Sequence, residues 1–257
     1  MTDLPVITSP LLADLPGVRH AFFTRQGGAS EGIYASLNHG LGSKDDVQRV
    51  QENRRRSAAH FGLPSERLLT AYQIHSPEAA IAREPWTERP RVDGVVTATP
   101  GLICGALAAD CAPVLLADPQ ARVVAAAHAG WRGALGGVVE SAIARMVELG
   151  AAAGRIVAAV GPCIGPPSYE VGLEFLASFE TADPAYARFF APGEVADKRL
   201  FDLPAFVLSR LRAAGVGACA WTGHDTVADP ALFYSNRRAF RQGEPDYGRL
   251  LSAIVLT

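Results

Sequence analysis

The sequence predicts one domain of the α/β or α+β class that covers residues 1–257, and three observations lead to this prediction. The chain of 257 residues is 49% hydrophobic and 19% charged, which supports a substantial core and differs from the composition of disordered chains. Short apolar runs, two of them joined as a hairpin, alternate with stretches of helical periodicity, a mixture typical of these classes. No repeat, low-complexity tract or linker divides the chain.

The first half of the chain is predicted to begin irregularly and then to form a helix. Residues 1–40 are glycine-rich, and the simplest interpretation of 24–30 is a surface loop. Apolar residues that share one face predict a helix over 45–61. Asp45 and Asp46 favour its positive end, and Gly62 favours its termination.

The middle of the chain is predicted to hold three buried strands. An apolar run over 102–109 ends abruptly at Asp110. Two further runs over 114–117 and 123–127 are separated by a turn signal, Asp-Pro-Gln-Ala, so we expect the second and third strands to form a hairpin.

The remaining elements alternate between helix and strand. A stripe of apolar residues predicts a helix over 134–149 that Gly150 caps. A strand is expected over 156–160, a helix over 203–214 and a final strand over 250–256.

Charge and segment composition limit the classes of partner. The 24 Lys and Arg residues against 26 Asp and Glu give a net charge of -2, which argues against a general nucleic-acid or anionic-membrane binder. No apolar run approaches the roughly 18 residues of a membrane span, and the first residues show no signal-peptide pattern. The four cysteines form no C-x-x-C pair or disulfide framework. We therefore expect a cytoplasmic protein, and its near-neutral charge is compatible with the monomer that we expect.

Three potential metal ligands lie where predicted strands end or turn: His75, Cys111 and His128. One thiolate with two imidazoles suits zinc, and three protein ligands leave a fourth tetrahedral position for water or substrate, as in catalytic sites. The predicted hairpin would return Cys111 and His128 to one edge, whereas His75 is remote in sequence. Spacing alone leaves open the commoner alternative of a buried, inert cysteine and structural histidines.

Two charged residues near these potential ligands could take part in the chemistry, and Cys111 could also act without a metal. Asp110 could orient a metal-bound histidine or accept a proton; alternatively, it caps backbone amides. Arg132, near a predicted helix start, would suit an anionic oxygen such as phosphate, with a surface salt bridge as the alternative. Cys111 activated by an imidazole could also attack an acyl or amide carbon directly.

Several motifs occur together in the order found in one known family. The chain resembles the YfiH family, whose members are also labelled laccase-like polyphenol oxidase, purine nucleoside phosphorylase and peptidoglycan editing factor. The resemblance extends over nearly the whole chain. The motifs that carry it are Thr24-Arg25-Gln26-Gly27-Gly28 with Ser36-Leu37-Asn38, Gln73-Ile74-His75-Ser76, Ala109-Asp110-Cys111-Ala112-Pro113-Val114, His128-Ala129-Gly130-Trp131-Arg132-Gly133 and Gly161-Pro162-Cys163-Ile164-Gly165.

The resemblance implies a fold, a metal site and an activity. The fold is a layered α/β sandwich in which a mixed sheet carries the site at its edge, and the zinc ligands are His75, Cys111 and His128. The activity is phosphorolysis of adenosine and inosine, with 5'-methylthioadenosine phosphorolysis and adenosine deamination alongside. We expect Asp110 to handle protons, Cys111 to belong to the catalytic centre, and phosphate or ribose to be bound by Arg25, Asn38, Arg132 and Arg237.

The family labels conflict, and the residue inventory helps to weigh them. A multicopper centre needs many histidines, whereas this chain has 6, scattered along its length, so a multicopper oxidase is not expected. A hydrolase that edits a cell-wall precursor, using Cys111 or zinc-bound water as the nucleophile, is the main alternative function. A non-catalytic protein that binds zinc structurally is the third.

Overall fold

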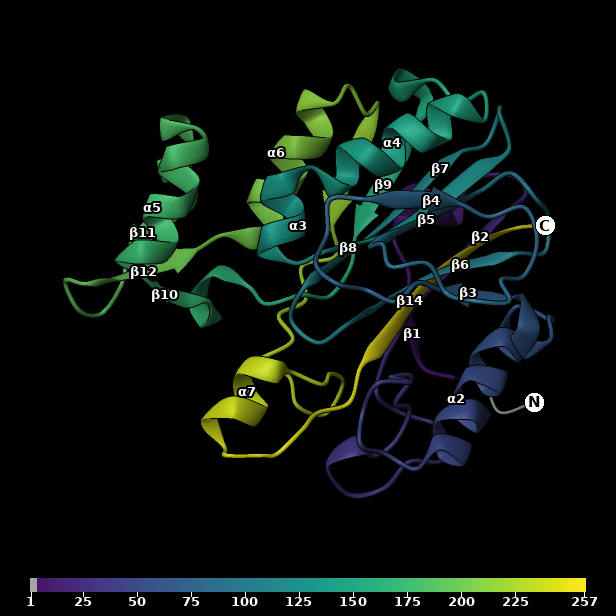
Figure 1. Ribbon diagram of the computed structural model, residues 1–257, viewed down its shortest axis with the longest axis horizontal. Helices are drawn as coiled ribbons and strands as arrows, with labels where there is room; N and C mark the ends of the chain where they lie inside the picture. Colours follow the sequence, from purple (N-terminus) through teal and green to yellow (C-terminus); the bar gives the residue numbers. More distant parts are fainter. Residues whose placement is uncertain (1–3) are drawn as a thin grey trace.

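Two mixed β-sheets pack face to face and carry helices on both outer faces in the computed structural model, which describes residues 4–257 (Figure 1). The strands are β1 Val6–Ile7, β2 Val18–Phe23, β3 Leu68–Thr70, β4 Ala79–Ile81, β5 Gly94–Thr97, β6 Ile103–Ala108, β7 Ala112–Asp118, β8 Val123–Ala129, β9 Val157–Val160, β10 Glu170–Gly172, β11 Phe190–Pro192, β12 Lys198–Phe201, β13 Ala218–Trp221 and β14 Leu250–Leu256. The α-helices are α1 Pro10–Ala13, α2 Val47–His60, α3 Trp131–Gly136, α4 Val138–Glu148, α5 Leu173–Ala182, α6 Leu203–Ala213 and α7 Asn236–Arg241. Single 3₁₀ turns occur at Gly32–Tyr34, Ser65–Arg67, Ala153–Arg155 and Pro166–Ser168, and a longer one at Pro184–Phe189.

The central six-stranded sheet has the order β13-β9-β7-β8-β5-β4. Strands β7 and β8 form the predicted hairpin, with Val114 opposite Ala127, and β9 and β5 flank it in antiparallel pairs. The outer pairs, β13 with β9 and β4 with β5, are parallel. The sheet is therefore mixed, as the resemblance implied.

The second sheet joins the two ends of the described chain. Its order is β1-β2-β14-β6-β3, and β14 pairs antiparallel with both β2 and β6. Because strands from the beginning, middle and end of the chain share one sheet, we propose that the whole chain folds as one domain. None of the helices within residues 4–257 has the length and apolar character needed to span a bilayer.

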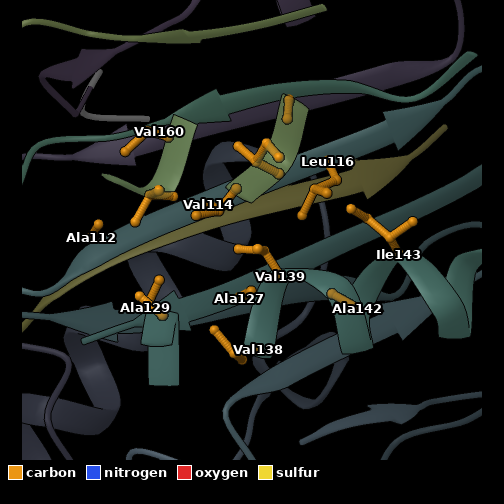
Figure 2. Close-up of a cluster of buried hydrophobic side chains, with 14 of the residues drawn as sticks. Ala112, Val114, Leu116, Ala127, Ala129, Val138, Val139, Ala142, Ile143 and Val160 are labelled. Atoms are coloured by element: carbon orange, nitrogen blue, oxygen red, sulfur yellow. The ribbon is translucent and has the colours of Figure 1, made fainter. Parts of the chain in front are cut away.

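Alternation along the central strands explains why they read as continuous apolar runs. In β7, Val114 and Leu116 face the helix layer, whereas Leu115 and Ala117 face the second sheet. Both faces of the strand are thus buried, which is typical of a strand inside a layered sandwich. Figure 2 shows the helix side of this core, where β7 and β8 side chains lie against Val138, Val139, Ala142 and Ile143.

The outer face of the second sheet packs against α2. Ala58 and Phe61, at the end of this helix, belong to the same buried cluster as Phe23 and Leu251. Asp46, which was expected at the positive end of this helix, caps α2 by accepting a hydrogen bond from the amide of Gln48.

Two predictions about elements are wrong for identifiable reasons. The helix expected over 134–149 begins three residues earlier and is broken into α3 and α4, because Gly137 adopts a left-handed backbone with φ 106°. The segment 1–40, expected to be irregular, contains the buried strand β2. Two polar residues within this strand, Arg19 and His20, obscured its apolar pattern. Arg19 is exposed, whereas His20 is buried and accepts a hydrogen bond from the amide of Ser9. The other predicted helices and strands are confirmed.

One part of the fold had no counterpart in the prediction. Helix α5 and the three-stranded sheet β10-β12-β11 extend to the left in Figure 1, away from the two main sheets. Phe179 of α5 is fully buried there, with its ring 4.8 Å from that of Phe201 and 5.0 Å from that of Phe206 on α6. This aromatic cluster attaches the extension to the helix layer.

Candidate metal centre

His75, Cys111 and His128 meet at one edge of the six-stranded sheet. Their potential ligand atoms all lie within 4.8 Å of one another, and Cys111 Sγ is 3.8 Å from His75 Nε2. The hairpin register places Pro113 opposite His128, so the residue before β7 lies beside the end of β8. The hairpin thus brings Cys111 and His128 together, as its pattern predicted.

A buried carboxylate that the sequence did not single out brings in the third residue. Asp93 Oδ1 accepts hydrogen bonds from His128 Nδ1 at 2.8 Å and from the amide of His75 at 3.0 Å. Asp93 Oδ2 accepts from the amides of Ile74 and Ser76 and from the Ser76 hydroxyl. Asp93 therefore fixes the loop that carries His75 and orients the His128 ring, leaving His128 Nε2 for a ligand.

Two residues at the cluster have unusual φ angles, and a third position must lack a side chain. His75 and Asp110 adopt positive φ angles of 62° and 88°, which non-glycine residues rarely do outside functional or constrained sites. Gly130 leaves room for the ligands, because a Cβ there would lie 2.7 Å from His75 Cδ2 and 2.9 Å from Cys111 Sγ.

The electrostatics of the cluster favour a thiolate. Burial opposes ionisation of Cys111, but the charge and hydrogen bonds of His128 and His75 outweigh it and lower the thiol pKa to about 6. Burial likewise opposes protonation of His128, but Cys111 and Asp93 outweigh it and raise its pKa to about 9. The cluster thus stabilises the deprotonated sulfur that both metal binding and nucleophilic attack require.

Two cavities meet at the cluster and share His75, Ala109 and Cys111 in their walls. The tyrosine cavity, about 300 Å³, is also lined by Gly40, Leu41, Gly42, Ala71, Tyr72, Gln73, Arg89, Leu107, Ala108, His128, Tyr247 and Arg249. The arginine cavity, about 200 Å³, is also lined by Asp110, Trp131, Arg132, Ile164, Tyr169, Leu203, Asn236 and Arg237. Both cavities therefore reach the cluster at His75 and Cys111.

Asp110 lies in the arginine cavity but does not orient a histidine. Its carboxylate is buried and accepts hydrogen bonds from Thr226 Oγ1 at 2.7 Å, Ser235 Oγ at 3.0 Å and the amide of Arg237 at 2.6 Å. Burial raises its pKa, although these hydrogen bonds oppose the shift. Asp110 thus has the amide-capping role that the sequence left open as the alternative, and Asp93 is the carboxylate that orients His128. A role of Asp110 in proton transfer stays a prediction.

The structure brings Arg132 and Arg237 to the cluster. Arg132 is exposed and lies over the ring of Trp131, with its guanidinium carbon 4.6 Å from the ring centre. Arg237 lies 5.3 Å from the ring centre of Tyr169 and donates from Nη1 to the carbonyl oxygen of Glu170. The surface salt bridge considered for Arg132 is not formed with any residue in 4–257.

The structure does not bring Arg25 or Asn38 to the cluster. Asn38 is fully buried; its amide donates to Ser43 and Asp45 and accepts from the amides of Gly40 and Arg249. It therefore positions Gly40 and Arg249 in the wall of the tyrosine cavity, and its expected contact with substrate stays a prediction.

Arg25 donates to the carbonyl oxygens of Ala35 and Pro230 and lies 4.5 Å from the ring centre of Tyr234. It lines a separate cavity of about 330 Å³ together with Arg238 and Tyr247. Direct contact of Arg25 with a ligand at the cluster is therefore not supported.

Asp93 is the important residue that sequence reasoning missed. It is an ionisable residue at the start of the apolar strand β5, the same signal that drew attention to Asp110 before β7. Tyr72 and Tyr247 line the tyrosine cavity without a local motif, because an aromatic residue in a loop does not reveal which surface it faces.

The fold and the cluster define a class of protein: a mixed α/β protein with a potential His-Cys-His metal site at a sheet edge. Comparisons with known proteins identify the family within this class. Residues 19–257 match the model of a family described as multi-copper polyphenol oxidoreductase laccase. A purine nucleoside phosphorylase from Deinococcus radiodurans is 41% identical over 256 residues, which cover 98% of this chain and 93% of that protein.

Solved structures agree with this placement. A Neisseria meningitidis protein superposes with a TM-score of 0.87 at 35% identity, covering 98% of both chains. YfiH from Bacillus licheniformis gives a TM-score of 0.86 at 27% identity, covering 95% of this chain and 94% of that one. The chain belongs to the YfiH family.

Proposed function

We propose that this protein is a zinc-dependent purine nucleoside phosphorylase that acts on adenosine and inosine. The observation that carries the proposal is the His75–Cys111–His128 cluster at the junction of two cavities, in a chain 41% identical to a purine nucleoside phosphorylase over nearly its full length. A cytoplasmic monomer that takes up only small molecules, the nucleoside and phosphate, is part of the same proposal.

The residues present fit zinc. A tetrahedral site with one sulfur and two nitrogen ligands places sulfur and nitrogen about 3.5 Å apart, close to the 3.8 Å between Cys111 Sγ and His75 Nε2. The carboxylate of Asp93 on His128 Nδ1 is the arrangement that commonly supports a zinc-bound histidine. Zinc, when bound, would supply an open coordination position that stabilises an anionic oxygen.

The chain's own groups would bind and orient the reactants. The hydrogen bonds of Asp93 hold the backbone of His75 and the ring of His128 in place, and those of Asp110 hold the start of α7 against the cluster. In the reaction, an oxygen of phosphate bonds to C1' of the ribose while the bond from C1' to the base breaks. The electron pair leaves with the purine, which takes up a proton, so no redox partner is needed.

The proposal is tested by metal analysis coupled to a product assay. Purified protein is expected to contain about one zinc per chain and to release hypoxanthine and ribose 1-phosphate from inosine only when phosphate is present. His128→Ala should lose both metal and turnover, whereas His60→Ala, on α2 and outside both cavities, should keep them. Protein without zinc, or protein that forms no free base, would refute the proposal.

The finer activities belong to the same proposal. We expect phosphorolysis of 5'-methylthioadenosine and deamination of adenosine at this site, as the family resemblance implies. Only one group of three or more His, Cys, Asp and Glu side chains within residues 4–257 is close enough to hold an ion, whereas multicopper chemistry requires several copper sites. Copper titration should therefore not generate a multicopper oxidase.

A cysteine hydrolase remains a second candidate because of one observation. The lowered pKa of Cys111, partly exposed beside two histidines, suits a nucleophile that attacks an amide of a cell-wall precursor. Hydrolysis that persists after complete chelation and disappears in Cys111→Ala would favour this function. Activity that requires added zinc after chelation would exclude it.

A further inference from the structure

We propose that the two cavities at the cluster divide the substrates between them: the arginine cavity is the phosphate subsite, and the tyrosine cavity holds the nucleoside. This inference rests on the proposed phosphorolysis and adds an assignment of each reactant to a set of residues. It requires that both cavities reach the same reacting atoms, that one of them suits a small dianion and that the other suits a larger, partly apolar molecule.

Both cavities reach the cluster because His75 and Cys111 stand in the wall of each. A nucleoside held in one cavity and phosphate held in the other would therefore both reach these two side chains. Within this proposal, the two cavities hold the incoming oxygen and the leaving base on opposite sides of C1', as a displacement at this carbon requires.

The arginine cavity has the charge that phosphate requires. The side chain of Arg132 is exposed, with Trp131 as its ring partner, and the guanidinium of Arg237 donates only one hydrogen bond, to a backbone carbonyl. Neither guanidinium has a carboxylate partner within the described chain, 4–257. Their remaining N–H groups are therefore available to phosphate oxygens, for which guanidinium is well suited.

The one acidic residue in this cavity does not cancel that charge by pairing with a guanidinium side chain. Asp110 directs its oxygens to Thr226, Ser235 and the amide of Arg237. The last of these bonds fixes the backbone of Arg237 at the start of α7. Asp110 therefore acts as a positioning residue for the phosphate subsite.

The tyrosine cavity has the size and lining that a nucleoside requires. Its volume of about 300 Å³ exceeds that of the arginine cavity, about 200 Å³, and it presents Tyr72 and Tyr247 together with Leu107. Aromatic rings and aliphatic side chains suit the face of a purine.

One of the two arginines in the tyrosine cavity is less available to an anion than those of the arginine cavity. Arg249 donates to the carbonyl oxygen of Tyr247 and lies 3.7 Å from a carboxylate oxygen of Asp246. Arg89 is exposed, lies 5.8 Å from the ring centre of Tyr72 and has no ion pair within residues 4–257. The arginine cavity thus has two guanidinium groups without a carboxylate partner and the tyrosine cavity has one, so the distribution of unpaired charge favours phosphate in the arginine cavity.

The test measures binding of each reactant separately, on the zinc-loaded full chain. Inorganic phosphate and inosine are titrated one at a time by calorimetry into wild type, Arg132→Gln, Arg237→Gln and Tyr247→Leu. Arg188→Gln is the matched control, because Arg188 also lies over an aromatic ring, 4.6 Å from the centre of Phe189, but lines neither cavity.

Loss of one guanidinium should weaken phosphate binding at least about tenfold, as expected for a hydrogen bond to a charged group, and leave inosine binding within about twofold. Tyr247→Leu should do the opposite, and Arg188→Gln should change neither. Because Arg132 is exposed and has no hydrogen bond to the described chain, its substitution should leave the thermal midpoint unchanged, which separates loss of binding from loss of folding. Phosphate affinity that survives in both arginine variants, or that falls only in Tyr247→Leu, would overturn the assignment.

Steady-state kinetics distinguish failure of this inference from failure of the proposed function. If phosphorolysis occurs but the KM for phosphate is unchanged in Arg132→Gln and Arg237→Gln, the function stands and the assignment is wrong. If phosphate binds as expected but no free base forms from inosine, the subsite stands and the proposed reaction is wrong.

Discussion

Replacing Asp93 with asparagine should separate the stability of the fold from the affinity of the metal centre. The substitution keeps the size of the side chain but puts an NH₂ group where one carboxylate oxygen stood. One oxygen now accepts from His128 Nδ1 and the amide of His75, and the other from two amides and a hydroxyl. Either orientation of the asparagine therefore leaves at least two donors facing another donor.

The magnitude follows from these contacts. Each buried donor without an acceptor costs about 1–3 kcal/mol, so the free energy of unfolding should fall by about 2–6 kcal/mol. If the NH₂ group faces His128, the ring can accept at Nδ1 only by moving its proton to Nε2, the atom needed for a metal. Loss of such a supporting carboxylate commonly weakens metal affinity about 10–100-fold, or about 1.4–2.7 kcal/mol.

The control is a buried carboxylate that makes similar bonds away from the cluster. Asp118 is fully buried and accepts from the amides of Gln120, Ala121 and Ala152 and from Arg155, but it ends β7, roughly 20 Å along the strand from Cys111. Asp118→Asn should therefore lose stability and keep metal affinity.

Zinc affinity is measured by competition with a chromophoric chelator at a temperature where both variants remain folded, and stability by urea titration. Asp93→Asn that matches wild type in zinc affinity while losing stability like Asp118→Asn would refute the orienting role assigned to Asp93.

Three further predictions test other parts of the structure. Gly130→Ala should weaken zinc binding by about 1–3 kcal/mol in the same competition assay, because the new Cβ would crowd His75 and Cys111. The backbone itself would not be strained, since the φ of −63° at this position suits alanine. Unchanged zinc affinity would contradict the predicted crowding. Burial lowers the pKa of His39 to about 3, so its contribution to stability is complete above the unfolded-state pKa of about 6.5 and is lost as pH falls towards 3. The stability difference between wild type and His39→Gln should shrink by about 1.5–2 kcal/mol between pH 6.5 and 5 in urea titrations, and a difference independent of pH would show that His39 is not held neutral. Phe179→Ala should cost about 3–5 kcal/mol in the same titrations, since its ring is fully buried among other rings; a loss below 1 kcal/mol would mean that the aromatic cluster can close around the gap.

A segment of the fold could be predicted where its own residues show whether it is buried and where it turns. The β7–β8 hairpin was predictable because uninterrupted apolar runs flank a turn signal, and both faces of these strands are indeed buried. Strand β2 was not, because its polar residue His20 is buried and accepts from the amide of Ser9, a contact that no local pattern reveals. The break between α3 and α4 at Gly137 was also missed, since a glycine within a helical pattern does not by itself indicate a left-handed backbone conformation.

The same distinction applies to the candidate site. Cys111 and His128 could be paired from the sequence because one hairpin separates them, whereas His75 joined them only as a third ligand of suitable type, which the family resemblance then supported. Arg132 was chosen for its position near a predicted helix start and Arg237 by the resemblance, and the structure brings both to one cavity. Asn38 was chosen by the resemblance as well, but all its side-chain hydrogen bonds are internal. The residue type alone could not show this, because a polar side chain can either contact a substrate or support the fold.

Two buried carboxylates explain how segments so distant in sequence form one site. Asp93 fastens the loop of His75 to the end of β8, and Asp110 fastens the start of α7, with Arg237, to the turn that carries Cys111. Because the two carboxylates share no hydrogen-bond partner, the metal ligands and the proposed phosphate subsite are supported by separate networks. Substitution of Asp93 should therefore act first on metal affinity, and substitution of Asp110 first on phosphate affinity, so that the two halves of the site can be weakened independently even though they meet at Cys111.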